Sequence, residues 1–222
     1  MAHSHLHRCL TAHMGVPRWW DERVVPRVVD VVLADRVVGA WRTRACAQAH
    51  GEVLELGFGS GGNLAHYPAA VCRVLAVEPS ELAWSHSSRA RAATGLEVTR
   101  VGLDGARIPL PDNAVDTVVA TWTLCTIPEL DAALGEVHRL LRPGGRLLFA
   151  EHSIPPDRVL GGAARGIAPA WAALAGGCRV DRDIPGELQR AGLAVQGLHA
   201  AYLTRAVPFG FFVCGAAQPA RS

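Results

Sequence analysis

One short segment, residues 53–63, constrains the fold of this 222-residue chain more than any other. It begins with the run Val-Leu-Glu-Leu, which is typical of a buried strand in a parallel sheet. Glycines follow at positions 57, 59 and 61, and their missing Cβ atoms let the backbone turn sharply and lie against a ligand. The segment predicts a strand, a ligand-binding loop and the start of a helix. A tight turn without a ligand is the alternative.

Glu55 restricts which ligands this loop can hold. A phosphate loop uses bare N–H groups with a lysine or a helix N-terminus, and this chain contains no lysine. A nucleoside triphosphate is therefore not expected. The spacing of Gly57, Gly59 and Gly62 also satisfies G-x-G-x-x-G, which by itself is compatible with a dinucleotide. A carboxylate beside the loop favours a ligand that carries positive charge, such as the sulfonium and amino groups of S-adenosylmethionine.

Two further acidic residues follow predicted strands. Glu78 ends the apolar run 71–77 and lies 21 positions after Gly57, the distance at which the next parallel strand presents an acid to a ribose diol. Asp104 follows a predicted strand at 96–101, where a carboxylate can accept a hydrogen bond from an adenine amino group. Open α/β sheets bind ligands at the carboxyl ends of their strands. The three acids therefore indicate a nucleoside cofactor.

Composition excludes several classes of function. Half of the residues are apolar, but no run approaches the about 20 residues that cross a bilayer, so no transmembrane segment is expected. The net charge of +2, without a basic stripe, argues against a nucleic-acid partner. The six cysteines are scattered and form no C-x-x-C pair, so we predict free thiols and no metal site. Free thiols favour a reducing cytoplasm as the location of the protein. Residues 1–16, with several histidines, are predicted to be a disordered tail rather than metal ligands.

The rest of the chain alternates between predicted strands and helices. A helix with an apolar stripe starts near Pro26 and is expected to pack on the sheet, and residues 155–178 suit a partly helical cap. The further predicted strands are residues 115–125, 146–150, 193–201 and 207–216, and the further predicted helices are residues 129–141 and 184–191. We therefore predict one α/β domain over residues 17–216. Its Rossmann-like, seven-stranded sheet is mostly parallel, with helices on both faces and the last strand antiparallel.

Three segments together resemble the class I S-adenosylmethionine-dependent methyltransferases: residues 53–61, 108–116 and 140–145. The resemblance implies that the glycine loop holds the methionine part of the cofactor. It also implies that Glu78 binds the ribose and that Asp104 with Gly105 lies beside the adenine. The predicted cofactor-binding residues are Glu55, Gly57, Gly59, Gly61, Asn63, Glu78, Pro79, Asp104, Gly105 and Thr121.

A narrower likeness involves residues 121–126, Glu151-His152, and Gly177-Cys178-Arg179 with Arg182. These are similar to the human methyltransferase-like alkyl thiol methyltransferases, although a counterpart of their N-terminal membrane-anchoring segment is not expected in this sequence. The likeness implies a small-molecule thiol acceptor. A more distant likeness to the methyltransferases of ubiquinone and menaquinone synthesis, and to phospholipid N-methyltransferases, leaves a quinone, phenol or amine acceptor open.

Methyl transfer is a direct displacement, so the protein mainly aligns the reactants and excludes water. A thiol with a pKa of about 8.5 needs only a weak base, and His152 is the candidate; a histidine packed at a strand end is the alternative. The predicted lining of the acceptor pocket, under an N-terminal helical lid and the cap, is Trp19, Trp20, Trp122, Cys125, Trp171 and Cys178. A small NAD-dependent oxidoreductase and a non-catalytic cofactor-binding partner of another subunit remain alternatives. The oligomeric state is not predicted.

Overall fold

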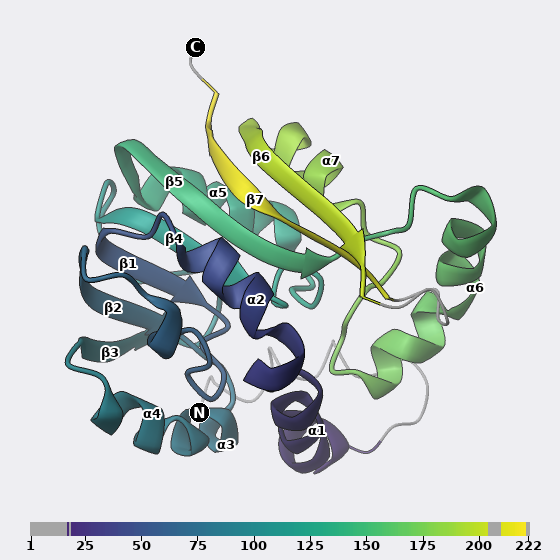
Figure 1. Ribbon diagram of the computed structural model, residues 1–222, viewed down its shortest axis with the longest axis horizontal. Coiled ribbons are helices and arrows are strands. Elements are labelled where there is room, and N and C mark those ends of the chain that lie inside the picture. The colour runs from purple at the N-terminus through teal and green to yellow at the C-terminus, as the bar shows by residue number, and fades with distance from the viewer. Residues whose placement is uncertain (1–16, 18, 204–209, 221–222) are drawn as a thin grey trace, which may run out of the picture.

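The computed structural model describes residues 17, 19–203 and 210–220 (Figure 1). A single seven-stranded sheet has the order β3-β2-β1-β4-β5-β7-β6. Every neighbouring pair is parallel except the pairs of β7 with β5 and with β6. The predicted fold class is therefore confirmed. The strands are β1 Gly51–Leu56, β2 Val71–Val77, β3 Glu97–Gly102, β4 Val115–Thr121, β5 Leu141–His152, β6 Leu193–Tyr202 and β7 Phe211–Pro219.

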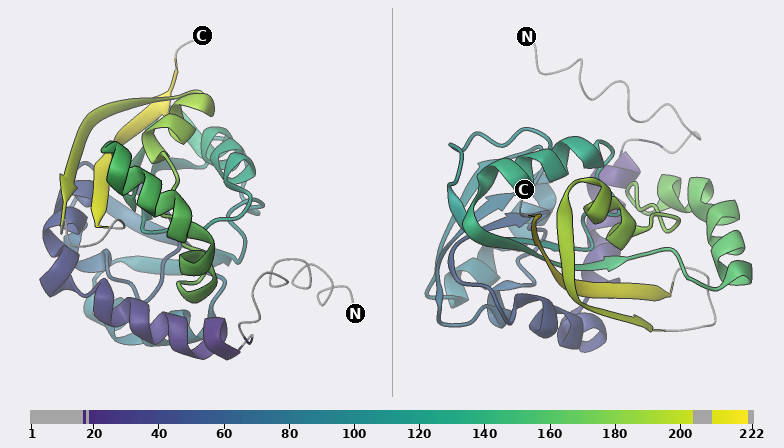
Figure 2. Two further views of the ribbon diagram at one scale, coloured as in Figure 1. Left: turned by 90° about the vertical axis from the view of Figure 1, so that its right-hand side faces the viewer. Right: turned by 90° about the horizontal axis from the view of Figure 1, so that it is seen from above.

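Helices cover both faces of this sheet, because successive side chains of each strand point to opposite faces. Val53 packs in the same cluster as Cys46 of α2 (Asp35–Cys46), whereas Leu54 packs in the cluster of α5 (Leu130–Leu140). The α5 face also holds α7 (Ile184–Arg190), and the α2 face holds α3 (Glu81–His86) and α4 (Ser88–Ala93). Figure 2 shows α2 and α5 on opposite sides of the sheet.

The strand order reverses direction at β1, which pairs in parallel with both β2 and β4. Glu55 is in register with Val119, and Thr121 is in register with Ala150 of β5. The carboxyl ends of β1, β4 and β5 therefore lie side by side along one edge. Ligands of open α/β sheets bind at such a switch point.

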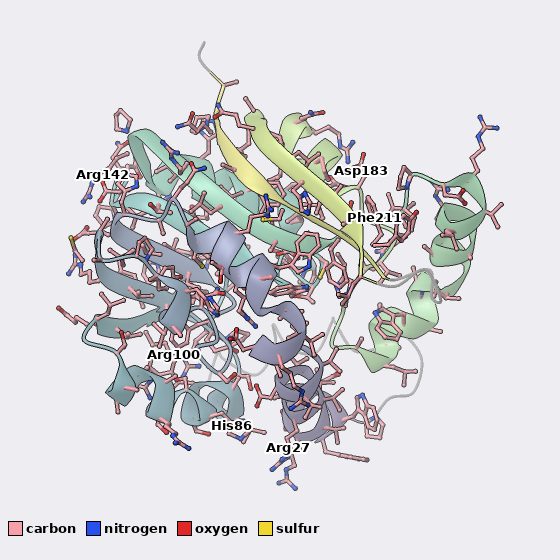
Figure 3. The ribbon with its side chains drawn as sticks, in the orientation of Figure 1. Arg27, His86, Arg100, Arg142, Asp183 and Phe211 are labelled. Atoms are coloured by element: carbon pink, nitrogen blue, oxygen red, sulfur yellow. The ribbon has the colours of Figure 1, made fainter. Side chains whose placement is uncertain are left out.

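The first helices differ from the predicted packing. A π-helix at Trp20–Val24 continues into α1 (Val25–Val32), and no residue of α1 is buried; Val31 is 60% exposed. The expectation that the valine stripe packs on the core sheet is therefore wrong. Figure 1 shows α1 below α2, outside the area that the sheet covers, and Figure 3 shows Arg27 pointing away from the molecule. A helix with no sheet beneath it has no core surface on which to bury its stripe.

The segment 155–178 contains the 17-residue helix α6 (Arg158–Leu174). Asp157 caps it by accepting hydrogen bonds from the backbone N–H groups of Val159 and Leu160, each at 2.9 Å. The indole N–H of Trp20 donates to the carbonyl of Leu174 at 2.9 Å, so the N-terminal segment contacts the end of α6. None of the described helices has the length and hydropathy that a membrane crossing requires. The predicted tail at 1–16 and the turn at 204–208 lie outside the described residues.

Candidate active site

The glycine loop after β1 has the backbone conformation that glycine allows. Gly57, Gly59 and Gly61 have φ values of 66°, 58° and 80°, in the left-handed region that L side chains rarely adopt. A Cβ built on Gly57 would stand 2.1 Å from the Thr123 hydroxyl oxygen, whereas one on Gly59 would meet only a backbone carbonyl at 4.0 Å. The chain is therefore tightly packed beneath Gly57, and the space above Gly59 is open to a ligand.

Glu78 lies directly against this loop. One carboxylate oxygen accepts a hydrogen bond from the Gly59 N–H at 2.7 Å, and the other accepts from the Ser80 N–H at 2.7 Å. Burial raises the pKa of Glu78, although both backbone hydrogen bonds act in the opposite direction. The fold thus places Glu78 against the glycine loop, as the 21-residue spacing between Gly57 and Glu78 predicts.

The helix expected after the loop is reduced to a single 3₁₀ turn, Leu64–His66. Tyr67, which precedes Pro68, is extended with a ψ of 131° and ends the turn, as the residue before a proline usually does. A dinucleotide pyrophosphate is normally held at the N-terminus of a full helix. The geometry therefore argues against NAD.

Glu55 is buried beneath the loop in a hydrogen-bonded network. Its carboxylate accepts from the Asn63 amide at 2.9 Å and from the Tyr67 hydroxyl at 2.6 Å. The Asn63 amide also donates to the Thr121 hydroxyl at 3.0 Å, and Arg42 donates to the Asn63 carbonyl oxygen at 2.8 Å. Burial raises the pKa of Glu55 to about 7. Both carboxylate oxygens are thus engaged inside the protein, and the network fixes Asn63 and Thr121 at the edge of the sheet.

The predicted adenine-side residues lie on more open loops. Asp104 is exposed after β3, and its carboxylate accepts from the Ala106 N–H at 2.8 Å in a tight turn. Gly105 is half-buried, and a Cβ there would lie 3.5 Å from Ile127. Pro79 is exposed directly after Glu78. These loops face the same edge of the sheet as the glycine loop, because they follow its next two parallel strands.

The loop after β4 is held by a buried carboxylate that the sequence analysis does not assign. Glu151 accepts hydrogen bonds from the backbone N–H groups of Thr123 at 2.8 Å, Leu124 at 2.9 Å and Cys125 at 3.3 Å. Burial raises the pKa of Glu151 to about 7. Trp122 begins this loop with a φ of 53°, a strained value for a bulky residue. Such strain is found where the surrounding structure fixes the backbone, often at functional sites.

Two cysteines and a histidine from separate parts of the chain meet beside this loop. The Sγ atoms of Cys125 and Cys178 are 3.5 Å apart, and the Cys178 Sγ is 3.7 Å from Nδ1 of His152. The His152 ring lies 4.4 Å from the ring of Phe212, centroid to centroid. Figure 3 shows the neighbouring Phe211 at the start of β7, between the sheet and α6. The group therefore lies where β5, β7 and the segment after α6 converge.

The pKa values of the two thiols are shifted in opposite directions. The hydrogen bond with Cys125, followed by the contact with His152, lowers the pKa of Cys178 to about 5, although burial opposes this. The hydrogen bond with Cys178 and then burial raise the pKa of Cys125. Ionisation of the pair is therefore favoured at Cys178, which also contacts His152, over Cys125.

The predicted tryptophans divide into two groups. Trp171 packs in the same cluster as Cys125 and Cys178, and Trp122 lies edge-on to Phe212 with a centroid separation of 6.3 Å. The buried indole N–H of Trp122 has no hydrogen-bond partner among the described residues. Trp20 lies against the end of α6, and Trp19, which is 52% exposed, meets the edge of Trp20. Trp171 therefore lies beside the thiols, Trp122 is linked to the group through Phe212, and the N-terminal pair lies at the periphery.

Residues 54–149 match a family described as a methyltransferase domain. Residues 54–149 therefore belong to a methyltransferase domain, and the fold is that of the class I S-adenosylmethionine-dependent methyltransferases. The solved structure of a candidate methyltransferase from Bacillus halodurans has a TM-score of 0.68 at 16% identity, over 82% of this chain and 98% of that one. This likeness bears on the fold, and the family match confirms the class that the sequence predicts.

Curated relatives of the methyltransferase domain fall into two kinds. Thiol S-methyltransferase TMT1B of Rattus norvegicus is 32% identical over 146 residues, which cover 63% of this chain and 58% of the relative. The ubiquinone/menaquinone biosynthesis C-methyltransferase UbiE of Rubrivivax gelatinosus is 34% identical over 120 residues, which cover 52% of this chain and 46% of the relative. This chain thus spans about half the length of these relatives.

The methyltransferase domain has a cradle that fits S-adenosylmethionine. The left-handed glycines leave open space above Gly59, the Glu78 carboxylate borders it, and Thr121 ends the adjacent strand. Sequence reasoning missed Arg42 and Tyr67, which complete the Glu55 network, because neither has a spacing that relates it to the loop. Glu151 is named from the sequence only as the neighbour of His152, and its role in holding the loop after β4 is not predicted, although its position at a strand end is a usable signal.

Proposed function

We propose that this protein transfers the methyl group of S-adenosylmethionine to the sulfur of a small thiol. The observation that carries the proposal is the group formed by Cys125, His152 and Cys178 at the carboxyl ends of β4 and β5. The loops after β1, β2 and β3 form the cofactor side, so the loops after β4 and β5 face the methyl group. The thiol S-methyltransferase relative supports the same acceptor class.

On the cofactor side, Glu78 would accept hydrogen bonds from the two ribose hydroxyls. Its carboxylate already orients the glycine loop, whose open face at Gly59 suits the methionine part. Asp104 with Gly105 and Pro79 would border the adenine. Glu55 would act through Asn63, because both of its oxygens are already engaged. S-adenosylmethionine supplies an activated methyl group, so these residues need only hold it in line with the acceptor.

On the acceptor side, the thiol must lose its proton before or during attack on the methyl carbon. The Cys178 sulfur faces Nδ1 of His152, which favours the tautomer with a proton on Nδ1 and a free lone pair on Nε2. His152 is half-buried, whereas Cys125 and Cys178 are 1% and 6% exposed. We therefore assign the acceptor proton to His152 and the walls of the pocket to Trp122, Trp171 and the two cysteines, with Trp19 and Trp20 closing its rim.

A quinol or phenol acceptor is the second candidate, because the chain also resembles a quinone C-methyltransferase over 52% of its length. The two readings differ in what the pocket must recognise. Carbon methylation requires an aromatic ring to be held flat and deprotonated, whereas a thiol needs only its sulfur to be placed. The two buried sulfurs beside His152 suit a soft sulfur acceptor better than a hydrated oxygen.

The test is methyl transfer from labelled S-adenosylmethionine to a panel of alkyl thiols, aryl thiols, quinols, phenols and amines. We expect turnover with thiols that exceeds turnover with every other class. Faster methylation of a quinol would establish the second candidate. Tight cofactor binding without turnover of any acceptor would favour a non-catalytic binding subunit.

A further inference from the structure

Cys125, His152 and Cys178 place two sulfurs and one imidazole nitrogen close together in a largely buried position. The two Sγ atoms and the histidine nitrogen all lie within 4.8 Å of one another. One ligand comes from the loop after β4, one from the end of β5 and one from the segment after α6. We infer that these three residues form a binding site for a soft divalent cation of the Zn²⁺ class.

The separations match those between ligands of a tetrahedral zinc ion. Zinc bonds of about 2.3 Å to sulfur and about 2.0–2.1 Å to nitrogen place two thiolates about 3.8 Å apart, and a thiolate and an imidazole about 3.5 Å apart. The observed distances are 3.5 Å between Cys125 and Cys178, and 3.7 Å between Cys178 and His152. Shifts of a few tenths of an ångström would therefore suffice for these two pairs.

The charge of the group also suits a cation. Two sulfurs 3.5 Å apart cannot both ionise at neutral pH without a positive charge between them, because like charges at this distance repel strongly. A divalent cation would neutralise two thiolates. The nearest charged side chains have opposite signs: Glu151 binds the Cys125 N–H, and Arg182 donates to the carbonyl of Leu124.

The ligands are fixed by other contacts, which lowers the cost of assembling a site. Glu151 holds the Cys125 N–H at 3.3 Å, and the Cys125 carbonyl accepts from the Arg179 N–H at 2.8 Å. Phe212 packs against the His152 ring. No metal site is predicted from the sequence, because these ligands are 27 and 26 positions apart and form no C-x-x-C pair. Only the fold brings them together.

Three protein ligands leave a fourth position, which is the arrangement of catalytic rather than structural zinc sites. Because the cysteines are buried and His152 is half-exposed, an incoming group reaches the site from the His152 side. This step rests on the proposed function, with the bound cation taking over from His152 the role of promoting ionisation of the acceptor. The acceptor sulfur takes the fourth position as a thiolate and releases its proton to solvent. Its lone pair then forms the new S–CH₃ bond as the bond from the methyl carbon to the sulfonium breaks. The thioether and S-adenosylhomocysteine are released.

The site is tested by titrating Co²⁺ into the full chain after reduction and chelation, without cofactor or acceptor. Residues 1–13 contain His3, His5, His7, His13 and Cys9, whose side chains are of types that can ligate added Co²⁺ and would complicate the titration. All variants are therefore made in a background with each of these histidines changed to Gln and Cys9→Ser. We expect one equivalent of Co²⁺ to give a thiolate-to-cobalt charge-transfer band and intense visible bands of a four-coordinate ion. Zn²⁺ should displace it.

Loss of an outer-shell partner weakens metal binding by about 10–100-fold. We expect a larger loss of Co²⁺ affinity in each of three ligand variants, Cys125→Ser, Cys178→Ser and His152→Ala. Cys72→Ser, at an exposed cysteine of β2, is the matched control and should leave the titration unchanged. Circular dichroism verifies that each variant is folded. Absence of the charge-transfer band in the reduced parent protein, or unchanged affinity in a folded Cys178→Ser variant, would overturn the site.

Activity separates the site from the proposed function. Thiol methylation that requires Zn²⁺ and is lost with Cys178→Ser would support the role of the fourth position. Full activity in the chelated protein would overturn that role and leave His152 as the base. Cobalt binding without turnover of any thiol would overturn the proposed function while supporting the metal site.

Discussion

Replacing Glu78 by alanine is expected to weaken S-adenosylmethionine binding by about 10- to 150-fold. The buried carboxylate orients Gly59 and would accept the ribose hydroxyls. A hydrogen bond to a charged group contributes about 1.5–3 kcal/mol, which gives this range for one lost ribose bond. The side chain also accepts from Ser80, so its loss loosens the start of α3 and adds to the effect.

Isothermal titration calorimetry with S-adenosylmethionine and S-adenosylhomocysteine measures this change. Glu78→Gln keeps the shape and one oxygen acceptor, so its affinity should lie between those of the parent and Glu78→Ala. Glu81→Ala removes an exposed carboxylate three positions away, paired with Arg100, and should leave the affinity unchanged. A folded Glu78→Ala protein that binds both nucleosides within two-fold of the parent would refute the ribose assignment.

Three further predictions concern the acceptor side, the buried acids and the loop. His152→Ala should lower the turnover number with thiols by about 10²–10⁴-fold at neutral pH and leave cofactor affinity unchanged. The loss of turnover should become smaller as the pH rises toward the thiol pKa of about 8.5, because the thiol then ionises without a base. An unchanged pH profile would contradict the assignment of His152 as the base. Burial raises the pKa of Glu151 from 4.5 to about 7, so the native state binds more protons in this window and the free energy of unfolding falls as pH rises through it. Glu151→Gln should reduce this fall in urea denaturation, while Glu55, with the same shift, maintains the remainder; an identical slope would count against the shift. Gly59→Ala should abolish cofactor binding and lower the free energy of unfolding by about 1–2 kcal/mol. Gly57→Ala should destabilise the fold further in the same denaturation assay, because its Cβ would stand 2.1 Å from the Thr123 hydroxyl oxygen. Equal stability of the two variants would refute this prediction.

The sheet and the cofactor cradle could be predicted because their signals are local. The apolar run before Gly57 fixes a buried strand, and the glycines allow the left-handed turn that follows. Glu78 could be related to the loop because the crossover between two neighbouring parallel strands has a typical length, which this chain keeps although its crossover helix is reduced to a 3₁₀ turn. Its hydrogen bond to the Gly59 N–H is the contact that this spacing implies.

Tertiary structure decided what depends on contacts between distant parts of the chain. A valine stripe predicts a helix but not whether a sheet lies beneath it, and α1 leaves its valines exposed. Arg42 reaches the Glu55 network from α2, where its spacing relates it to nothing in the loop. The sequence indicates Cys125, His152 and Cys178 separately, but no spacing predicts that the three side chains meet. They come together because the ends of β4 and β5 are adjacent in the sheet and the segment after α6 folds back over them.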